Sequence, residues 1–177
     1  APVLLVDYPS RDSMTQIYGT FVRALMTVHP NLSNCAQAVT NSIVQIYTES
    51  KAAFTTALQA HYIYSPRELS RYLRALYKAM LGLDVMSPED LVRLVAHEGL
   101  RLFFDRLVED DSRAACLDVI EGAVRTHFPS SVNMQVALRR PILFSSWLSG
   151  RYESVDQEKL REFVKARLQV YSEEEQA

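Results

Sequence analysis

Apolar side chains recur at steps of three and four residues through most of this sequence, and this spacing limits the fold more than any other feature. In the stretch SMTQIYGTFVRAL, for example, Met14, Ile17 and Phe21 fall on one side of a helix. The same spacing predicts helices over about residues 13–29, 33–48, 65–81, 87–108 and 113–127, and a last helix from residue 156 onward. The predicted fold class is therefore mostly α.

One short run breaks this helical pattern. Val3–Val6 (VLLV) is continuous and apolar, and Asp7 and Pro9 end it, which is typical of a strand buried on both faces of a sheet. No second strand is evident, and a single strand cannot form a sheet. We therefore expect its sheet to lie outside this chain, which would begin inside a larger domain, and we expect the run itself to be disordered, mispaired or paired at an edge. An ordered sheet of three or more strands would contradict this expectation.

Local signals predict where several helices begin. Asp12 or Ser13 is expected to cap the first helix, and Ser13 and Gln16 have the spacing of a capping box. Ser65–Pro66 and Ser87–Pro88 each place serine at the cap and proline at the first helical position, and an acid follows within the first turn. Asp156 is expected to begin the last helix.

Other signals concern helix ends and the C-terminal third. Gly82 suits a left-handed position after the third helix. Val155 and Leu160 are spaced as a hydrophobic staple. The short apolar stretch RRPILFSSWL is expected to be extended and to pack Phe144 and Trp147 on the helices.

Composition argues against several classes of function. The net charge is −2, so no bulk attraction to nucleic acid or to an anionic membrane is expected. No run reaches the roughly 18 apolar residues of a membrane span. Cys35 and Cys116 lie far apart and outside metal-ligand spacing, so we interpret them as apolar helix residues. With five glycines, the chain contains no GxxxxGK[ST] or GxGxxG phosphate loop.

Arg67 stands in the first turn of the third helix, where the macrodipole is positive and a cation is disfavoured. First-turn amides can bind phosphate, and arginine adds a planar, bidentate fork. Arg71 and Arg74 follow at four and seven residues, so the three share one face. They are candidates for a phosphate-sensing site. The alternative is a solvated basic face on which Glu68 offsets Arg67, and spacing alone favours this alternative.

The stretch LVRLVAHEGLRLFFDRLVED contains His97–Glu98, but Arg101 occupies the place of the second histidine of an HExxH zinc site. Zinc catalysis and any other metal site are therefore not expected. Arg93, His97, Arg101 and Asp105 follow one another at four-residue steps, and Glu98 lies three residues before Arg101. Such spacing favours an ion-paired helix held in a fixed orientation against its neighbours.

Together these stretches resemble the dynein heavy chain family, and most closely the third AAA+ module of its cytoplasmic form. VDYPS and SMTQIYGTFVRAL are similar to the last core strand and first lid helix, and HYIYSPRELSRYLRAL to the helix that carries the sensor-2 arginine. HEGLRLFFDRL is similar to a lid motif that recurs along dynein rings. RPILFSSWLS and VDQEKLREFVKARLQVY are similar to the segment leading toward the fourth module. The resemblance covers nearly the whole chain.

The resemblance implies a helical AAA+ lid subdomain with one orphan N-terminal strand from a missing α/β core. It divides the chain into the last core strand and a linker (1–10), the helical lid (11–108), a helix with an irregular apolar segment (109–153), and a helix leading to the next module (154–177). By position in the motif, Arg67 matches the sensor-2 arginine that reaches the nucleotide phosphates. Pro66 and Arg71 are further candidates for nucleotide binding.

The function implied by the resemblance is part of a microtubule motor ATPase. The lid would close over ATP or ADP, with Mg²⁺ held in the missing core, and would relay the nucleotide state around the ring to gate motor activity. Because the Walker motifs are absent, the isolated chain is expected to be inactive and to bind no nucleotide tightly. Expected partners are its own core, the fourth module, dynein accessory subunits and, through the full-length chain, microtubules. The expected location is the cytoplasm and cytoskeleton, without nucleic-acid or membrane partners.

A function of another class fits the same residues without a nucleotide. The tyrosine-rich helices and the lack of catalytic residues are also typical of a helical protein-interaction module. That alternative predicts a stable monomer with a groove for a partner and no strand in search of a sheet.

Overall fold

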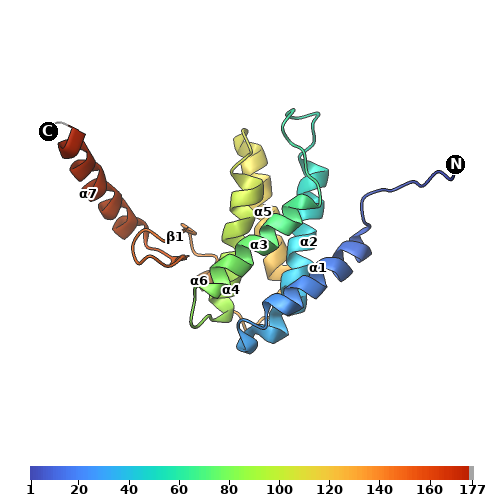
Figure 1. The fold of residues 1–177 in the computed structure, drawn as a ribbon, viewed down its shortest axis with the longest axis horizontal. Coiled ribbons are helices and arrows are strands. Elements are labelled where there is room, and N and C mark those ends of the chain that lie inside the picture. The colour runs from blue at the N-terminus through green and yellow to red at the C-terminus, as the bar shows by residue number, and fades with distance from the viewer. Residues whose placement is uncertain (176–177) are drawn as a thin grey trace.

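The apolar spacing of the sequence produces helices, as expected, in the computed structural model, which describes residues 1–175 and side chains through residue 172 (Figure 1). In chain order the elements are α1 (Arg11–Leu25), the 3₁₀ helix η1 (Pro30–Cys35), α2 (Ala36–Ala53), α3 (Arg67–Leu81), α4 (Pro88–Gly99), the π-helical turn η2 (Leu100–Phe104), α5 (Asp110–His127), α6 (Met134–Ala137), β1 (Phe144–Ser145), β2 (Glu153–Ser154) and α7 (Gln157–Glu175). The mostly α fold class is confirmed.

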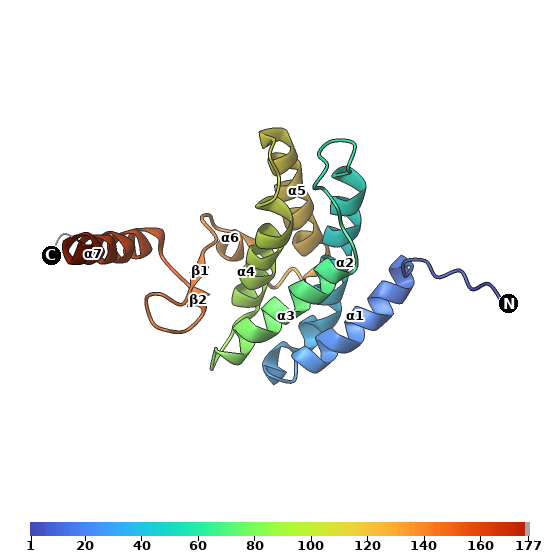
Figure 2. The same ribbon diagram turned by 45° about the horizontal axis from the view of Figure 1, so that its top comes forward.

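Helices α1 to α5 pack around a single core (Figure 2). α2 lies at the centre of the bundle, where it contacts α1, α3, α4 and α5. The largest side chains with almost no exposed surface include Tyr47, Tyr72, Phe103, Met26, Leu32, Ile43, Ile46, Leu69, Leu76, Met80, Met86 and Leu91. Burying one large apolar side chain contributes about 1.5–3 kcal/mol, so this core is the main source of the bundle's stability.

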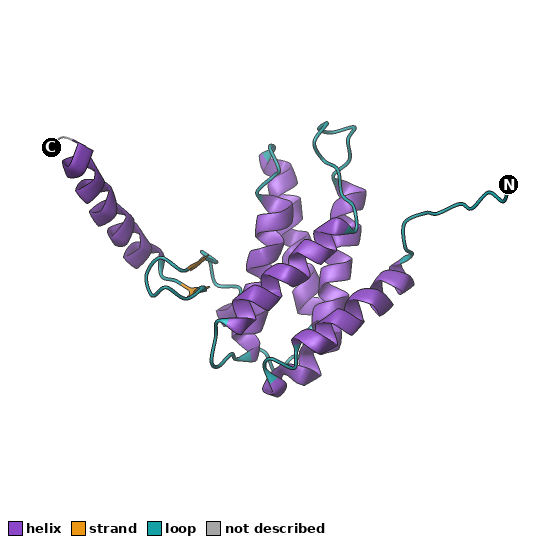
Figure 3. Ribbon diagram, in the orientation of Figure 1, coloured by secondary structure: helices purple, strands orange, loops and turns teal. Residues whose placement is uncertain are grey.

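The N-terminal apolar run takes no part in that core. Residues 1–10 have no regular secondary structure, and the side chains of Val3–Val6 are between 85% and 95% exposed. Among the described residues the strands are β1 and β2 alone, paired antiparallel with Phe144 opposite Ser154 (Figure 3). No sheet of three or more strands forms, so the expectation that this run finds no sheet within the chain is confirmed.

Four predicted helix starts are wrong by a few residues. α3 begins at Arg67, with Pro66 rather than Ser65 at the cap position, and α5 begins at Asp110 rather than near residue 113.

Ser10, rather than Asp12 or Ser13, caps α1: the Ser10 hydroxyl accepts a hydrogen bond from the Ser13 amide at 3.2 Å, and the helix begins at Arg11. Ser10 competes successfully because its backbone is already extended, as a cap requires. Before α2, Pro30 starts a 3₁₀ helix instead of a plain break, which delays the α-helix to Ala36.

Several helix ends also differ from the predictions. α1 ends at Leu25, before the predicted residue 29, and α2 continues to Ala53, beyond the predicted residue 48. Ser87 and Asp90 form the capping box of α4, with Pro88 in the first turn. That helix does not continue as α-helix to residue 108: it ends at Gly99 and turns π-helical, and the Asp105 amide then bonds to the Leu100 carbonyl. Gly82 has a φ of −85°, so the predicted left-handed position is wrong.

After the bundle, residues 138–156, which we call the connector, lead to α7. α7 extends away from the bundle at the side opposite the N-terminus (Figures 1 and 2). Asp156 begins this helix as predicted, because its carboxylate accepts hydrogen bonds from the amides of Glu158 and Lys159. Phe144 is half-buried and packs against the core of the bundle, as predicted. Trp147 is 63% exposed and lines a groove with Phe163 and Leu168 of α7, so it lies beside that helix and not on the bundle.

Candidate functional site

The start of α3 is built from four consecutive residues. The Glu68 carboxylate accepts hydrogen bonds from the Ser65 amide at 2.8 Å and the Ser65 hydroxyl at 3.0 Å. The Ser65 hydroxyl in turn accepts from the Arg67 amide at 3.3 Å. Glu68 is buried, so an anion already occupies the positive end of this helix. Arg67 is therefore not needed to complete the helix start.

Tyr18 on α1 also holds the first turn of α3 in place. Its hydroxyl donates to the Pro66 carbonyl at 2.8 Å and lies 3.3 Å from the hydroxyl of Ser70. The Ser70 amide also bonds to the Pro66 carbonyl. Because Pro66 has no amide hydrogen and its carbonyl is already bonded, it can position the helix start but offers no donor to a ligand.

The arginines of α3 face solvent. Arg67, Arg71 and Arg74 are exposed, and Lys78 continues the same face one turn later. None of these four side chains makes a hydrogen bond or an ion pair with any residue that the structure describes. The predicted common face is thus confirmed, and it presents four cations with no anionic partner.

A groove of about 570 Å³ lies between α1 and α3, beside this basic face. Its walls are mainly apolar and include Phe21, Leu73 and Tyr77, while Arg74 joins the groove to the row of arginines. Tyr18 and Ser70 also line it. The start of α3, the basic face and the groove therefore form one continuous surface.

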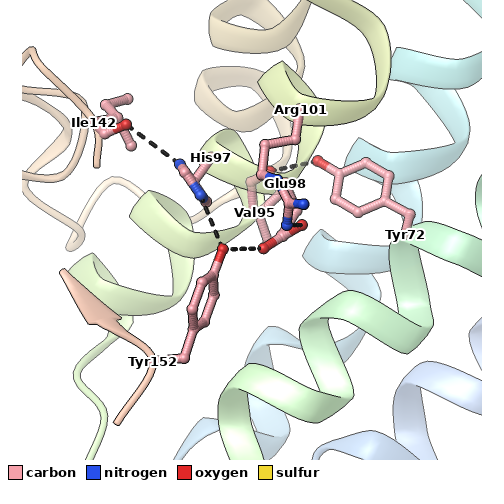
Figure 4. Close-up of polar contacts among 7 residues, drawn as sticks. All are labelled: Tyr72, Val95, His97, Glu98, Arg101, Ile142 and Tyr152. Atoms are coloured by element: carbon pink, nitrogen blue, oxygen red, sulfur yellow. Dashed lines mark hydrogen bonds and ion pairs between the residues drawn. The ribbon is translucent and has the colours of Figure 1, made fainter. Parts of the chain in front are cut away.

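The His97–Glu98 motif on α4 contacts the connector and forms one of the ion pairs predicted along its own helix (Figure 4). His97 Nε2 lies 2.9 Å from the Tyr152 hydroxyl, which donates to Glu98 Oε1 at 2.7 Å. Glu98 Oε2 pairs with Arg101 at 3.2 Å. Of the predicted intrahelical ion pairs, this Glu98–Arg101 pair forms, whereas Arg93 and His97 turn to the connector.

Burial and the Glu98 carboxylate shift the pKa of His97 in opposite directions and that of Tyr152 in the same direction. Burial lowers the pKa of His97 below its ordinary value, and the Glu98 carboxylate opposes that shift. Burial raises the pKa of Tyr152, and the hydrogen bond to Glu98 raises it further. Tyr152 therefore keeps its proton and donates a hydrogen bond to Glu98, so it can only accept from His97 Nε2. A neutral ring with its hydrogen on Nε2 has none on Nδ1 to donate to the Ile142 carbonyl, so in that ring the hydrogen bond that reaches the connector is the one to Tyr152.

Gly99 in the same motif allows α3 and α4 to approach closely. A Cβ atom at this position would lie 2.8 Å from the Tyr72 hydroxyl oxygen. That hydroxyl donates to the buried Val95 carbonyl (Figure 4). The glycine is thus required by packing and not by a catalytic step.

The described residues contain no group of three His, Cys, Asp or Glu side chains placed to hold a metal ion. Cys35 and Cys116 are both free and buried, as the sequence predicts. None of the described helices is both long and apolar enough to cross a membrane.

Some residues of these clusters could be found from the sequence and others could not. Ser65 and Glu68 have the S-x-x-E spacing of a capping box, so the role of Glu68 was accessible. Tyr18 lies 48 residues before Pro66, and Tyr152 lies 54 residues after Glu98. Contacts over such separations leave no local pattern.

Comparisons with known proteins agree with the resemblance noted in the sequence. The family described as dynein heavy chain, ATPase lid domain, matches residues 21–113. The cytoplasmic dynein heavy chain of Dictyostelium discoideum is 55% identical over 175 residues, which are 99% of this chain and 4% of that protein. The cytoplasmic dynein heavy chain of Drosophila melanogaster is 48% identical over 174 residues, 98% of this chain and 4% of that protein. Dynein heavy chain-like protein 1 of Plasmodium falciparum (isolate 3D7) is 39% identical over 173 residues, 98% of this chain and 3% of that protein.

Proposed function

The chain belongs to the dynein heavy chain family, whose ATPase lid domain it matches, and we propose that it closes over a nucleotide held by the third AAA+ module of a cytoplasmic motor. It would relay the state of that nucleotide around the ring and so gate microtubule release. The chain spans about 4% of the length of the relatives it matches, so the activity of a whole motor is a proposal for it.

The observation that carries this proposal is the start of α3. Arg67 is exposed and its side chain is unpaired among the described residues, while Glu68 and Tyr18 hold the turn beneath it. A guanidinium held on a rigid helix start and left without an anion is suited to phosphate oxygens. Arg71, one turn later on the same face, would be the second contact.

The donor set fits the phosphates of ATP or ADP but not the accompanying metal. Arg67 and Arg71 offer only cationic donors, and Mg²⁺ prefers carboxylate and water oxygens. The described residues place no carboxylate cluster at the start of α3. We therefore assign Mg²⁺, the Walker residues and hydrolysis to the core of the module, and propose that this chain alone is inactive.

We further propose the division of the chain that the resemblance implies. Residues 1–10 would supply the last core strand, 11–108 the lid, 109–153 a helix with an irregular segment, and 154–177 a helix toward the fourth module. The exposed Val3–Val6 run supports the first of these assignments, because an autonomous interaction module would not leave four adjacent apolar side chains in water.

The proposed partners are the module's own core, the fourth module, accessory subunits and, through the full-length chain, microtubules, in the cytoplasm and on the cytoskeleton. The test replaces Arg67 by alanine in the full-length motor and measures microtubule release as a function of nucleotide. Loss of nucleotide dependence with unchanged microtubule affinity is expected. A motor that keeps normal nucleotide affinity, hydrolysis and motility would contradict the proposal, and Arg23→Ala on α1 serves as the control.

A further inference from the structure

Arg93 on α4 binds the connector and the end of α6 through main-chain oxygens. Its guanidinium donates to the carbonyls of Ala137 at 3.2 Å, Arg139 at 2.7 Å and Pro141 at 2.7 Å, and its Nε donates to the Ser154 hydroxyl at 2.9 Å. The Arg93 side chain therefore forms hydrogen bonds with both ends of the connector.

One helical turn later, His97 and Glu98 hold the same segment. His97 Nδ1 lies 3.3 Å from the Ile142 carbonyl, and the Tyr152 hydroxyl bridges His97 and Glu98 at 2.9 and 2.7 Å (Figure 4). The Phe144 ring packs against His97 with ring centres 4.9 Å apart. Four side chains, Arg93, His97, Glu98 and Tyr152, which we call the clasp, thus join α4 to both strands of the hairpin.

The connector also has apolar and ionic contacts with the bundle. Leu138 and Ile142 belong to the core, Phe144 and Tyr152 pack against it, and Arg140 pairs with Glu121 on α5 at 2.6 Å. Leu138, Ile142 and Val155 are its only buried residues, and Ser146–Arg151 are exposed. The exposed pair Arg151–Asp84 adds a contact at 2.8 Å, but such a pair contributes little in water. α7 begins directly after the connector and stands clear of the bundle (Figure 1). Between Ile142 and α7 only Val155 is buried, so the direction of α7 depends on the polar contacts with α4 together with the partial burial of Phe144 and Tyr152.

We propose that the clasp is a releasable joint that fixes the direction of α7 relative to the helical bundle. Breaking its hydrogen bonds frees the connector and α7 while the core of α1 to α5 stays folded. The assignment of a task to this movement rests on the proposed function, because α7 would then be the element through which the lid moves the next module. Within that function, Arg93, His97, Glu98 and Tyr152 are positioning residues and touch no nucleotide.

The test measures the distance between spin labels on the bundle and on α7 in this chain. Lys78→Cys on α3 and Lys165→Cys on α7 provide two exposed thiols. Cys35 and Cys116 are buried, and burial raises the pKa of both thiols, that of Cys116 to about 12, so they resist labelling. A narrow distance distribution is expected for the otherwise unchanged chain.

Two conservative variants remove hydrogen bonds of the clasp without leaving a cavity. Tyr152→Phe keeps the ring and removes the bridging hydroxyl, and Arg93→Lys keeps the charge but loses the multiple donors of the guanidinium. Both are expected to widen the distance distribution while helix content and the unfolding transition of the bundle stay close to those of the parent. Tyr77→Phe and Arg23→Lys, at exposed positions outside the clasp, should leave the distribution narrow.

The pH dependence of the distance distribution tests whether the hydrogen bonds of the clasp, and not apolar packing alone, hold α7 in place. The charged or titratable groups around His97 are Glu98, Arg101 and Asp105 on its own helix and turn, and Tyr152 from the connector. Since burial lowers the pKa of His97, the closed clasp favours the neutral ring, and acidification below the ordinary histidine pKa of about 6.5 favours the open one. The distribution should widen between pH 7.5 and pH 5, and His97→Gln should remove that dependence.

A broad distribution in the parent chain, or a narrow one in both Tyr152→Phe and Arg93→Lys, would overturn the proposal. Unfolding of the whole bundle together with α7 in these variants would also overturn it, because the joint would then not be separable from the core. The measurement needs no nucleotide and no core. It can therefore fail while Arg67 still senses nucleotide in the motor, and it can succeed while Arg67 does not.

Discussion

Helices α3 and α4 begin with nearly the same letters, SPRE and SPED, and use them differently. At α4, Ser87 and Asp90 cap each other, and Glu89 accepts a hydrogen bond from the Asn133 amide at 2.9 Å. At α3, Glu68 takes the same part as Asp90, but Arg67 stands where α4 has Glu89. Arg67 contacts no anion among the described residues, whereas Glu89 is used within the fold.

This difference separates a structural helix start from one that is open to a ligand. An acid in the first turn of a helix is stabilised by the macrodipole, and an exposed arginine there is destabilised by about 0.3–1 kcal/mol. The first turn of α4 is complete within the chain. The first turn of α3 is complete beneath Arg67 and carries an unpaired cation above it, which is the arrangement expected if an external phosphate supplies the missing charge.

The largest expected effect comes from removing the buried acid of α3. Glu68→Ala leaves the Ser65 amide and hydroxyl without their acceptor in a buried setting, which should lower the free energy of unfolding by about 2–3 kcal/mol. Asp90→Ala at the exposed start of α4 should cost only about 1 kcal/mol. Urea denaturation of both variants measures the difference, and equal losses would show that the two helix starts are equivalent.

The second-largest effect on stability is expected at Gly99, where α3 and α4 approach closely. Gly99→Ala forces a methyl group against the Tyr72 hydroxyl, 2.8 Å away, and should destabilise the chain by about 2 kcal/mol through overpacking. Gly122→Ala on α5 meets no atom within 4 Å and should instead stabilise by about 0.5–1 kcal/mol. Thermal unfolding of the pair checks the opposite signs, and a neutral Gly99→Ala would rule out the close approach.

A smaller effect is expected where α1 fixes the start of α3. Tyr18→Phe removes the hydrogen bond to the Pro66 carbonyl and should cost about 1 kcal/mol. The loss should be local, so hydrogen exchange at the Ser70 amide should speed up while the amides of α5 keep their protection. Tyr77→Phe, on the rim of the groove, is the matched control. Uniform acceleration through the bundle would mean that Tyr18 does not act on this turn in particular.

The smallest effects on stability should have opposite signs at the two helix starts. Arg67→Ala removes a cation from a positive helix end and should raise the unfolding free energy by about 0.3–0.5 kcal/mol at low salt. Glu89→Ala removes a favourable charge and the hydrogen bond to the Asn133 amide, and should lower it by about 1 kcal/mol. A destabilised Arg67→Ala chain would show that Arg67 serves the fold, contrary to its assignment to a ligand.

Much of this comparison is visible in the sequence, because helix starts and apolar spacing are local. The mostly α fold, the capping box of Ser87 and Asp90, the unpaired Val3–Val6 run and the common face of the three arginines all follow from patterns within a few residues. The errors at Ser10 and Gly82 are also local, since neighbouring residues can compete for a cap and a helix can end without a left-handed residue.

The clasp and the Tyr18 contact were not predictable in the same way. Arg93 and His97 have good partners on their own helix by spacing, yet they bind a segment more than 40 residues away. The connector exposes carbonyl groups that would otherwise lack donors, and this need outweighs the small gain from an ion pair on a helix surface. Only the tertiary arrangement shows where those carbonyls lie.

Nucleotide affinity of the module made with its own α/β core is the most direct test of the role assigned to Arg67. Losing a charged hydrogen bond of about 1.5–3 kcal/mol, Arg67→Ala should weaken ATP or ADP binding by about 10- to 100-fold, while Arg23→Ala on α1 leaves it unchanged. If Arg67→Ala binds nucleotide as tightly as the parent module, the unpaired arginine at the start of α3 does not contact phosphate, and the difference between the two helix starts has no functional meaning.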